Sequence, residues 1–120
     1  MDHHYEKLDV WKRSCQLAVD VYRAFKGVHD PVFRDQMIRA SLSIPSNIAE
    51  GCERKSDKEF LRFLNIAVGS AAELRTQALI CTKADILPKP TAQHIARESN
   101  EIAAMHRGLQ KTLQSPPHDF

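Results

Sequence analysis

Apolar residues recur along this chain at spacings of three and four, in four stretches separated by short breaks. This spacing places the apolar residues of each stretch on one face of a helix, and no β-hairpin signal interrupts it. In the first stretch the apolar face consists of Leu8, Trp11, Cys15, Ala18, Tyr22 and Phe25. The pattern predicts four helices, with ends placed to within about 2–4 residues, over 6–26, 31–53, 57–84 and 91–114.

Residues that favour helix ends stand where these stretches begin and stop. Gly27 suits the end of the first helix, and Asp30 suits the cap of the second. Ser56 and Glu59 form a capping box for the third helix, and Thr91 is expected to cap the fourth. Connections this short favour antiparallel neighbours. The sequence therefore predicts one all-α domain over 1–120, an antiparallel up-down-up-down four-helix bundle with a frayed tail at 115–120.

The third helix is apolar around most of its circumference, and only a narrow ribbon on it is polar. A helix of this kind is surrounded by partners, and three other helices of one chain do not easily surround it. This feature predicts self-association. The candidate residues for a subunit interface are Leu61, Val68, Ala72 and Leu79.

Polar residues also stand inside helical patterns where an ordinary bundle places apolar ones; they are Asn47, Glu50, Ser70 and Glu73. A buried polar group without a partner costs roughly 1–3 kcal/mol, so we expect these residues to form a structural network between helices two and three. A buried Asn can also fix the register and the oligomeric state of a helical assembly. A ligand pocket is the alternative interpretation, since convergent polar groups in an apolar bundle are typical of such pockets.

A basic corner is expected at the turn between helices two and three, formed by Arg54, Lys55, Lys58 and Arg62. Neighbouring carboxylates dilute this charge, so in a single chain the corner is a solvated surface. In a cyclic assembly the same corner would repeat and form a ring of positive charge. The corner is therefore the candidate nucleic-acid contact, and RNA phosphates are its expected ligand.

The net charge of +2 and the sequence pI near 8.5 do not by themselves indicate a nucleic-acid-binding protein. No apolar run is long enough for a signal peptide or a membrane span, so we expect a cytoplasmic protein without membrane contact. The cysteines Cys15, Cys52 and Cys81 are odd in number and widely spaced. They are expected to be small buried thiols in a reducing compartment and not a disulfide framework.

Candidate chemistry is sparse. Di-iron bundles need Glu-x-x-His pairs on two helices, but Glu98 is followed at the third position by Glu101. His94 and Glu98 lie one turn apart, and nothing elsewhere completes a ligand set. No glycine-rich phosphate loop occurs. We therefore expect no catalytic, metal-binding or cofactor-binding residues, and no enzyme.

The segment 43–51, which reads SIPSNIAEG, is followed by a second group of residues: Arg54, Ser56, Glu59, Phe60, Gly69, Ser70, Glu73 and Leu74. In these positions the chain resembles the four-helix bundle proteins encoded in intervening sequences of bacterial 23S ribosomal RNA genes. The resemblance covers about residues 5–113. It implies a compact bundle that assembles as a ring-shaped homopentamer, and it implies no known catalytic activity. A more distant related group comprises the accessory proteins of diversity-generating retroelements, which bind nucleic acid and a reverse transcriptase.

The leading hypothesis is a non-enzymatic, homo-oligomeric helical bundle that serves as a scaffold or adaptor. Its expected partner is a second copy of itself, in a pentamer. The alternative is an RNA-binding protein, or one that binds nucleic acid more generally, that uses a basic ring on the oligomer. Besides itself, its candidate partners are RNA and another protein. A small-molecule-binding bundle is the third hypothesis.

Overall fold

The computed structural model describes residues 4–114, and all of its regular structure is helical. The elements are a short 3-10 helix η1 (His4–Lys7) and the four helices α1 (Asp9–Ala24), α2 (Pro31–Cys52), α3 (Asp57–Lys83) and α4 (Lys89–Gln114). No strand occurs within the described range, so the prediction of an all-α fold with four helices is confirmed. The tail expected to fray, residues 115–120, lies outside the described residues.

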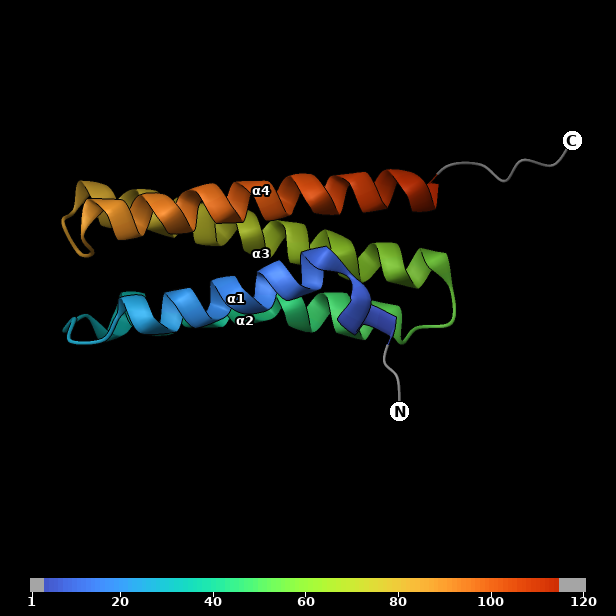
Figure 1. Cartoon of the computed structure of the whole chain (residues 1–120), viewed down its shortest axis with the longest axis horizontal. Coiled ribbons are helices and arrows are strands. Elements are labelled where there is room, and N and C mark those ends of the chain that lie inside the picture. The colour runs from blue at the N-terminus through green and yellow to red at the C-terminus, as the bar shows by residue number, and fades with distance from the viewer. Residues whose placement is uncertain (1–3, 115–120) are drawn as a thin grey trace, which may run out of the picture.

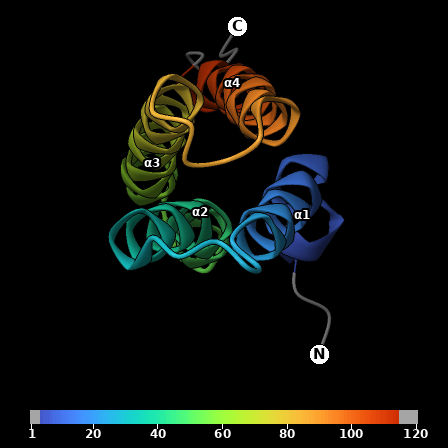
Figure 2. The same cartoon turned by 90° about the vertical axis from the view of Figure 1, so that its left-hand side faces the viewer.

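The four helices lie side by side along a common long axis (Figure 1). The α1–α2 and α3–α4 connections lie at one end of the molecule, and the α2–α3 connection lies at the other. Seen along this axis, α1 and α2 form one side of the bundle, and α3 and α4 close around the core from the other (Figure 2). The α1–α2 pair and the α3–α4 pair thus each present an outer surface.

The predicted helix ends at three of the breaks are confirmed by their hydrogen bonds and backbone angles. The Asp30 carboxylate accepts from the Phe33 N–H at 3.0 Å, and Pro31 occupies the first turn of α2. The Ser56 hydroxyl accepts from the Glu59 N–H at 3.2 Å. Gly27 has a φ of 79°, a left-handed conformation that a residue without a Cβ adopts at little cost.

Two helix starts differ from the prediction. α4 begins at Lys89, so Thr91 lies inside its first turn and is not the cap. The Pro88 carbonyl already accepts from the Ala92 N–H at 3.0 Å, and Pro90 needs no N–H partner in a first turn. α1 begins only at Asp9, because Leu8 is extended (φ −77°, ψ 125°) and breaks the helix after η1.

The core is formed by residues from all four helices. Its largest fully buried apolar side chains are Leu17, Val21, Met37, Ile44, Ile48, Leu64, Leu74, Cys81, Ile95 and Ile102. At the end near the α2–α3 turn, the two helices approach closely at Gly51. A Cβ there would stand 2.8 Å from Phe60 Cδ1 and 2.9 Å from Phe63 Cβ, so only glycine fits this contact.

Candidate functional site

The polar positions of α2 and α3 meet at one point of the boundary between these helices. The Ser43 and Ser70 hydroxyls lie 2.8 Å apart, across the two helices. Asn47 Nδ2 donates to the Ser43 carbonyl at 2.7 Å and to the Ser43 hydroxyl at 2.9 Å. Ser43 thus joins the Asn47 amide to α3, and we call these three residues the polar link.

The polar link corrects the expected contacts of Asn47. Asn47 was expected in a network between the second and third helices, but its side chain is half-buried and bonds within α2. Ser70 takes part through Ser43, which sequence reasoning did not assign to this network. Glu50 lies outside it, on the exposed side of α2, where it pairs with Arg54. Glu73 is exposed as well.

Two of the four residues in the predicted basic corner are engaged within the chain. Arg54 pairs with Glu50, and Arg62 donates to Glu59 at 3.1 Å. Both guanidinium groups also lie over the Phe63 ring, with Cζ at 4.9 Å and 4.6 Å from its centroid. Lys55 and Lys58 are exposed at the same turn, so they carry most of the charge that remains open to a ligand.

An open groove lies on the α1–α2 side of the bundle. It encloses about 530 Å³, and its residues are Cys15, Ala18, Val19, Tyr22, Arg23, Lys26, Ile38, Leu42 and Pro45. Tyr22 is 67% exposed and Leu42 is 52% exposed. The α1–α2 groove is therefore an apolar surface open to solvent, with two cations beside it.

A second exposed apolar surface lies on α3. Ile66 and Ile80 are 42% and 46% exposed, and Glu73 stands midway between them at spacings of seven residues. Residues seven apart share one face of a helix, so these three side chains form one row, which we call the α3 ridge.

The four residues predicted for a subunit interface lie on a different face of α3 from the ridge, as their spacing indicates. Leu61 and Val68 are half-buried within the chain. Ala72 is exposed, and Leu79 is 45% exposed. The exposed part of this face is therefore limited to its second half.

The three thiols are unpaired, and burial raises the pKa of each. For Cys81 the value is about 11, and its Sγ lies 3.6 Å from Met37 Sδ in the core. Since the thiolate is the nucleophilic form, these environments oppose thiol chemistry near neutral pH.

His106 is a buried titratable residue that sequence reasoning missed. It is fully buried on α4, and neither ring nitrogen has a hydrogen-bond partner in the described chain. Desolvation lowers its pKa to about 4. Its position four residues after Ile102 and three before Leu109 was the available signal, because both neighbours point inward.

Metal and membrane sites were also considered for residues 4–114. No group of three or more His, Cys, Asp or Glu side chains comes together there in a way that suits a metal ion. None of the helices in this range has the length and apolar composition needed to cross a membrane.

These features define a helical bundle with a closed apolar core, a polar link between two helices and an open apolar groove. The family described as 23S rRNA-intervening sequence protein matches residues 6–108, and the chain belongs to this family. The fold is similar to that of a solved protein of unknown function from the S23 ribosomal protein family of Bacteroides thetaiotaomicron. The TM-score is 0.79 at 24% identity, over 85% of this chain and 98% of that one. No curated protein matches the sequence.

Proposed function

We propose that this protein is a non-enzymatic scaffold, an up-down-up-down bundle that joins copies of itself into a ring. The observation that carries this proposal is the α1–α2 groove, where Tyr22 and Leu42 leave large apolar surface in water. Exposed apolar patches of this kind are typical of protein interaction sites. A second copy is the occupant that we propose for it.

We propose the α3 ridge as the surface that docks in the groove, because both are apolar and their charges are opposite. The groove is concave and apolar, with Arg23 and Lys26 among its residues. The ridge offers Ile66 and Ile80 to an apolar surface, and it places the Glu73 carboxylate between them. Charge complementarity of this kind favours one register of docking over others.

Groove and ridge are different surfaces of the same chain, so a contact between them is head-to-tail. Such a contact leaves one free groove and one free ridge at the ends of any open chain of copies. It closes into a ring when the rotation between neighbours allows, and it otherwise continues as a filament. The resemblance to ring-forming bundles favours closure, with five copies.

A cytoplasmic location fits this proposal. The thiols Cys15, Cys52 and Cys81 are all free. A scaffold with three unpaired thiols is best suited to a reducing compartment.

Two charge substitutions test the head-to-tail contact. Tyr22→Asp damages the groove but keeps the ridge, and Ile80→Asp damages the ridge but keeps the groove. Each variant alone is expected to be a monomer by light scattering, because the contact would bury an unpaired carboxylate. An equimolar mixture is expected to form a dimer, because one intact groove meets one intact ridge.

Circular dichroism serves as the folding control, since both substituted side chains are exposed. A wild-type protein that is monomeric at micromolar concentration contradicts the proposal. So does a mixture of the two variants that remains entirely monomeric although both variants are folded.

RNA binding through the basic corner is the second candidate function, favoured by the exposure of Lys55 and Lys58. Repetition around a ring would multiply these charges. Binding would be largely sequence-independent and would weaken with salt, because phosphate contacts release counterions. Arg54→Glu with Lys58→Glu is expected to abolish it without changing the oligomer. Absence of wild-type RNA binding at about 50 mM salt would exclude this function.

A further inference from the structure

Positive charge is concentrated on the outer surface of the α3–α4 pair, away from the groove and the ridge. Two rows of exposed residues run along this surface, and each row follows the spacing of three and four that keeps residues on one helix face. The α3 row is Lys58, Arg62, Asn65, Gly69, Ala72, Thr76, Leu79 and Lys83. The α4 row is Lys89, Gln93, Arg97, Asn100, Ala104, Arg107 and Lys111. We call the two rows together the cationic face; they contain seven Lys and Arg residues and no Asp or Glu.

Two contacts show that the rows lie next to each other. Gln110, beside the α4 row, donates to Asn65 of the α3 row at 2.6 Å. Nearer the other end, Arg75 and Leu79 of α3 line a cleft of about 280 Å³ together with residues of α4: Gln93, Ala96, Arg97 and Asn100. Arg75 is itself exposed and adds its charge to the cationic face.

Of the arginines on this face, Arg62 pairs with Glu59 at 3.1 Å, and the others are not neutralised by neighbouring side chains. Within residues 4–114, Arg75, Arg97 and Arg107 form no ion pair. On the α1–α2 side, Arg13 pairs with Glu98 at 2.8 Å and Arg34 with Asp35 at 3.0 Å, whereas Arg23 and Arg39 form no ion pair within the described residues. The open arginines therefore keep their charge available for an external anion.

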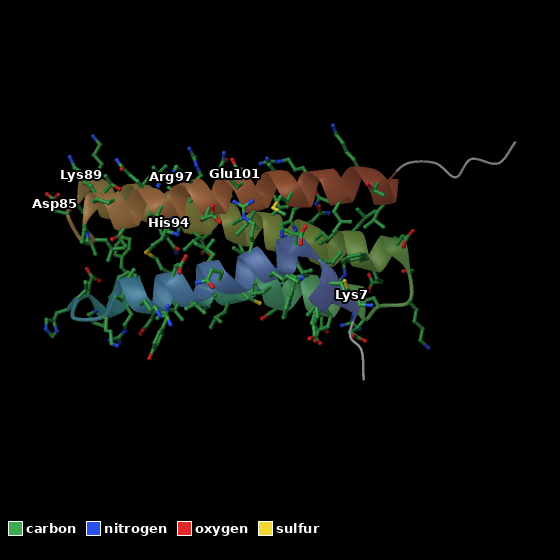
Figure 3. The ribbon with its side chains drawn as sticks, viewed as in Figure 1. Lys7, Asp85, Lys89, His94, Arg97 and Glu101 are labelled. Atoms are coloured by element: carbon green, nitrogen blue, oxygen red, sulfur yellow. The ribbon has the colours of Figure 1, made fainter. Side chains whose placement is uncertain are left out.

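Carboxylates occur only at the margins of the cationic face. Glu101 lies near Arg97 along α4 (Figure 3) but forms no ion pair with it, and it contributes to the raised pKa of Arg13 on α1. Glu73 belongs to the α3 ridge, Glu59 pairs with Arg62 near the start of the α3 row, and Asp57 and Asp85 lie at the two ends of α3. The length of the face between them is free of negative side chains.

We propose that the cationic face binds the phosphate backbone of a nucleic acid. The α3 row extends over roughly 38 Å at about 1.5 Å per residue, so it matches an extended polyanion better than a single phosphate group. Its uncharged residues are mostly small or have a side-chain amide, as Asn65 and Asn100 do. In protein–nucleic acid complexes, amide groups of this kind donate to phosphate and sugar oxygens.

The composition of the face also indicates how the nucleic acid is bound. No aromatic residue stands in either row, so the face offers no platform on which bases stack. Leu79 is its only large apolar side chain, which does not suit insertion into a lipid bilayer. The face therefore holds the backbone without reading the base sequence.

The cationic face shares Lys58 and Arg62 with the basic corner of the second candidate function, but Arg75, Arg97 and Arg107 do not belong to that corner, so substitutions at Arg97 and Arg107 separate the two sites. The cationic face is independent of assembly, because the groove and the ridge lie on other faces. Failure of RNA binding here and failure of self-association are thus separate results.

Fluorescence anisotropy with labelled RNA of about 20 nucleotides, single-stranded and duplex, tests the proposal in about 50 to 200 mM salt. The test variant is Arg97→Glu with Arg107→Glu. Its matched control is Lys12→Glu with Lys55→Glu, which makes the same change in net charge at exposed positions outside the face. Circular dichroism and light scattering establish that each variant keeps the wild-type fold and oligomer.

Wild-type protein is expected to bind RNA of unrelated sequences equally, with affinity that falls steeply as salt rises. The test variant is expected to lose roughly tenfold or more in affinity at about 50 mM salt, while the control loses much less. The salt dependence of the test variant should be shallower by roughly 1.4–1.8 in the slope of log affinity against log salt.

Four results would overturn the proposal: no wild-type binding at about 50 mM salt, equal losses in both variants, a larger loss in the control, or binding to anionic vesicles but not to RNA. Equal losses would show that net charge alone attracts the RNA. A larger loss in the control would instead assign binding to the corner that contains Lys55.

Discussion

The α1–α2 side of the bundle leaves an apolar groove open to solvent, whereas the α3–α4 side exposes two rows of cationic and small residues. Both sides are built from amphipathic helices that pack on one core. Folding requires only the inward face of each helix to be apolar, so it does not explain the difference between the outward faces. The two proposals assign Tyr22 and Leu42 on one side to a second copy of the chain, and Arg97 and Arg107 on the other to a nucleic acid.

Substitution of one exposed leucine on each side tests this comparison and is expected to give the largest effect. Leu42 in the groove is 52% exposed, and Leu79 on the α3–α4 side is 45% exposed. Leu42→Asp is expected to raise the dissociation constant of the oligomer roughly 100-fold or more, because a carboxylate without a partner would be buried in the contact. Leu79→Asp is expected to change it by less than about tenfold. Light scattering over a dilution series measures both.

The opposite ranking would relocate the interface. If Leu79→Asp dissociates the oligomer and Leu42→Asp does not, the contact uses the face of Leu61, Val68, Ala72 and Leu79. The groove would then have to serve another purpose.

The pH dependence of the free energy of unfolding tests whether His106 is desolvated in the core between the two sides. The pKa of this residue is about 4 in the folded chain and ordinarily 6.5, so the unfolded chain takes up the proton first. Stability is therefore fully present above about pH 6.5 and is lost as the pH falls toward about 4, by roughly 3 kcal/mol in total. Urea denaturation at a series of pH values measures this loss.

His106→Leu is the control, because it removes the titrating group and leaves the carboxylates in place. Its free energy of unfolding should decline less between pH 6.5 and pH 4 than that of the wild-type protein. Equal declines would show that His106 is not desolvated as described.

Alanine substitutions at two glycines, Gly51 in the α2–α3 contact and Gly69 on the cationic face, are expected to have the smallest effects on the free energy of unfolding. Gly51→Ala is expected to cost about 1–3 kcal/mol, because the new methyl group would meet Phe63 Cβ at 2.9 Å and Phe60 Cδ1 at 2.8 Å. At Gly69, on the cationic face, an added Cβ meets nothing within 4 Å. Gly69→Ala should therefore add about 0.5–1 kcal/mol to stability. Urea denaturation measures both, and a stabilising Gly51→Ala would be incompatible with the close helix contact.

The helices and most of their ends could be predicted because their signals are local. Asp30 and Ser56 cap the helices that follow them within three residues, so neighbouring residues alone define these ends. Thr91 was assigned wrongly as a cap, because the Pro88 carbonyl offered an earlier start to α4 and the sequence contained both signals.

The candidate sites were predicted less well. Asn47 and Ser70 do belong to one network, but Ser43 connects them, and sequence spacing could not show which of several serines would face α3. Arg54 and Arg62 were chosen by proximity in sequence, which did not show that both would lie over Phe63.

The sequence by itself determined the number of helices, their approximate lengths and the face that each turns inward, because a period of 3.6 residues is a property of each segment alone. Only the tertiary structure decided which outward faces became neighbours. The groove combines residues of α1 and α2, the polar link joins positions 27 residues apart, and the cationic face combines rows from α3 and α4. The desolvation of His106 likewise depends on the burial that packing imposes. Distances between side chains on different helices are set by packing, and no single segment of the sequence contains them.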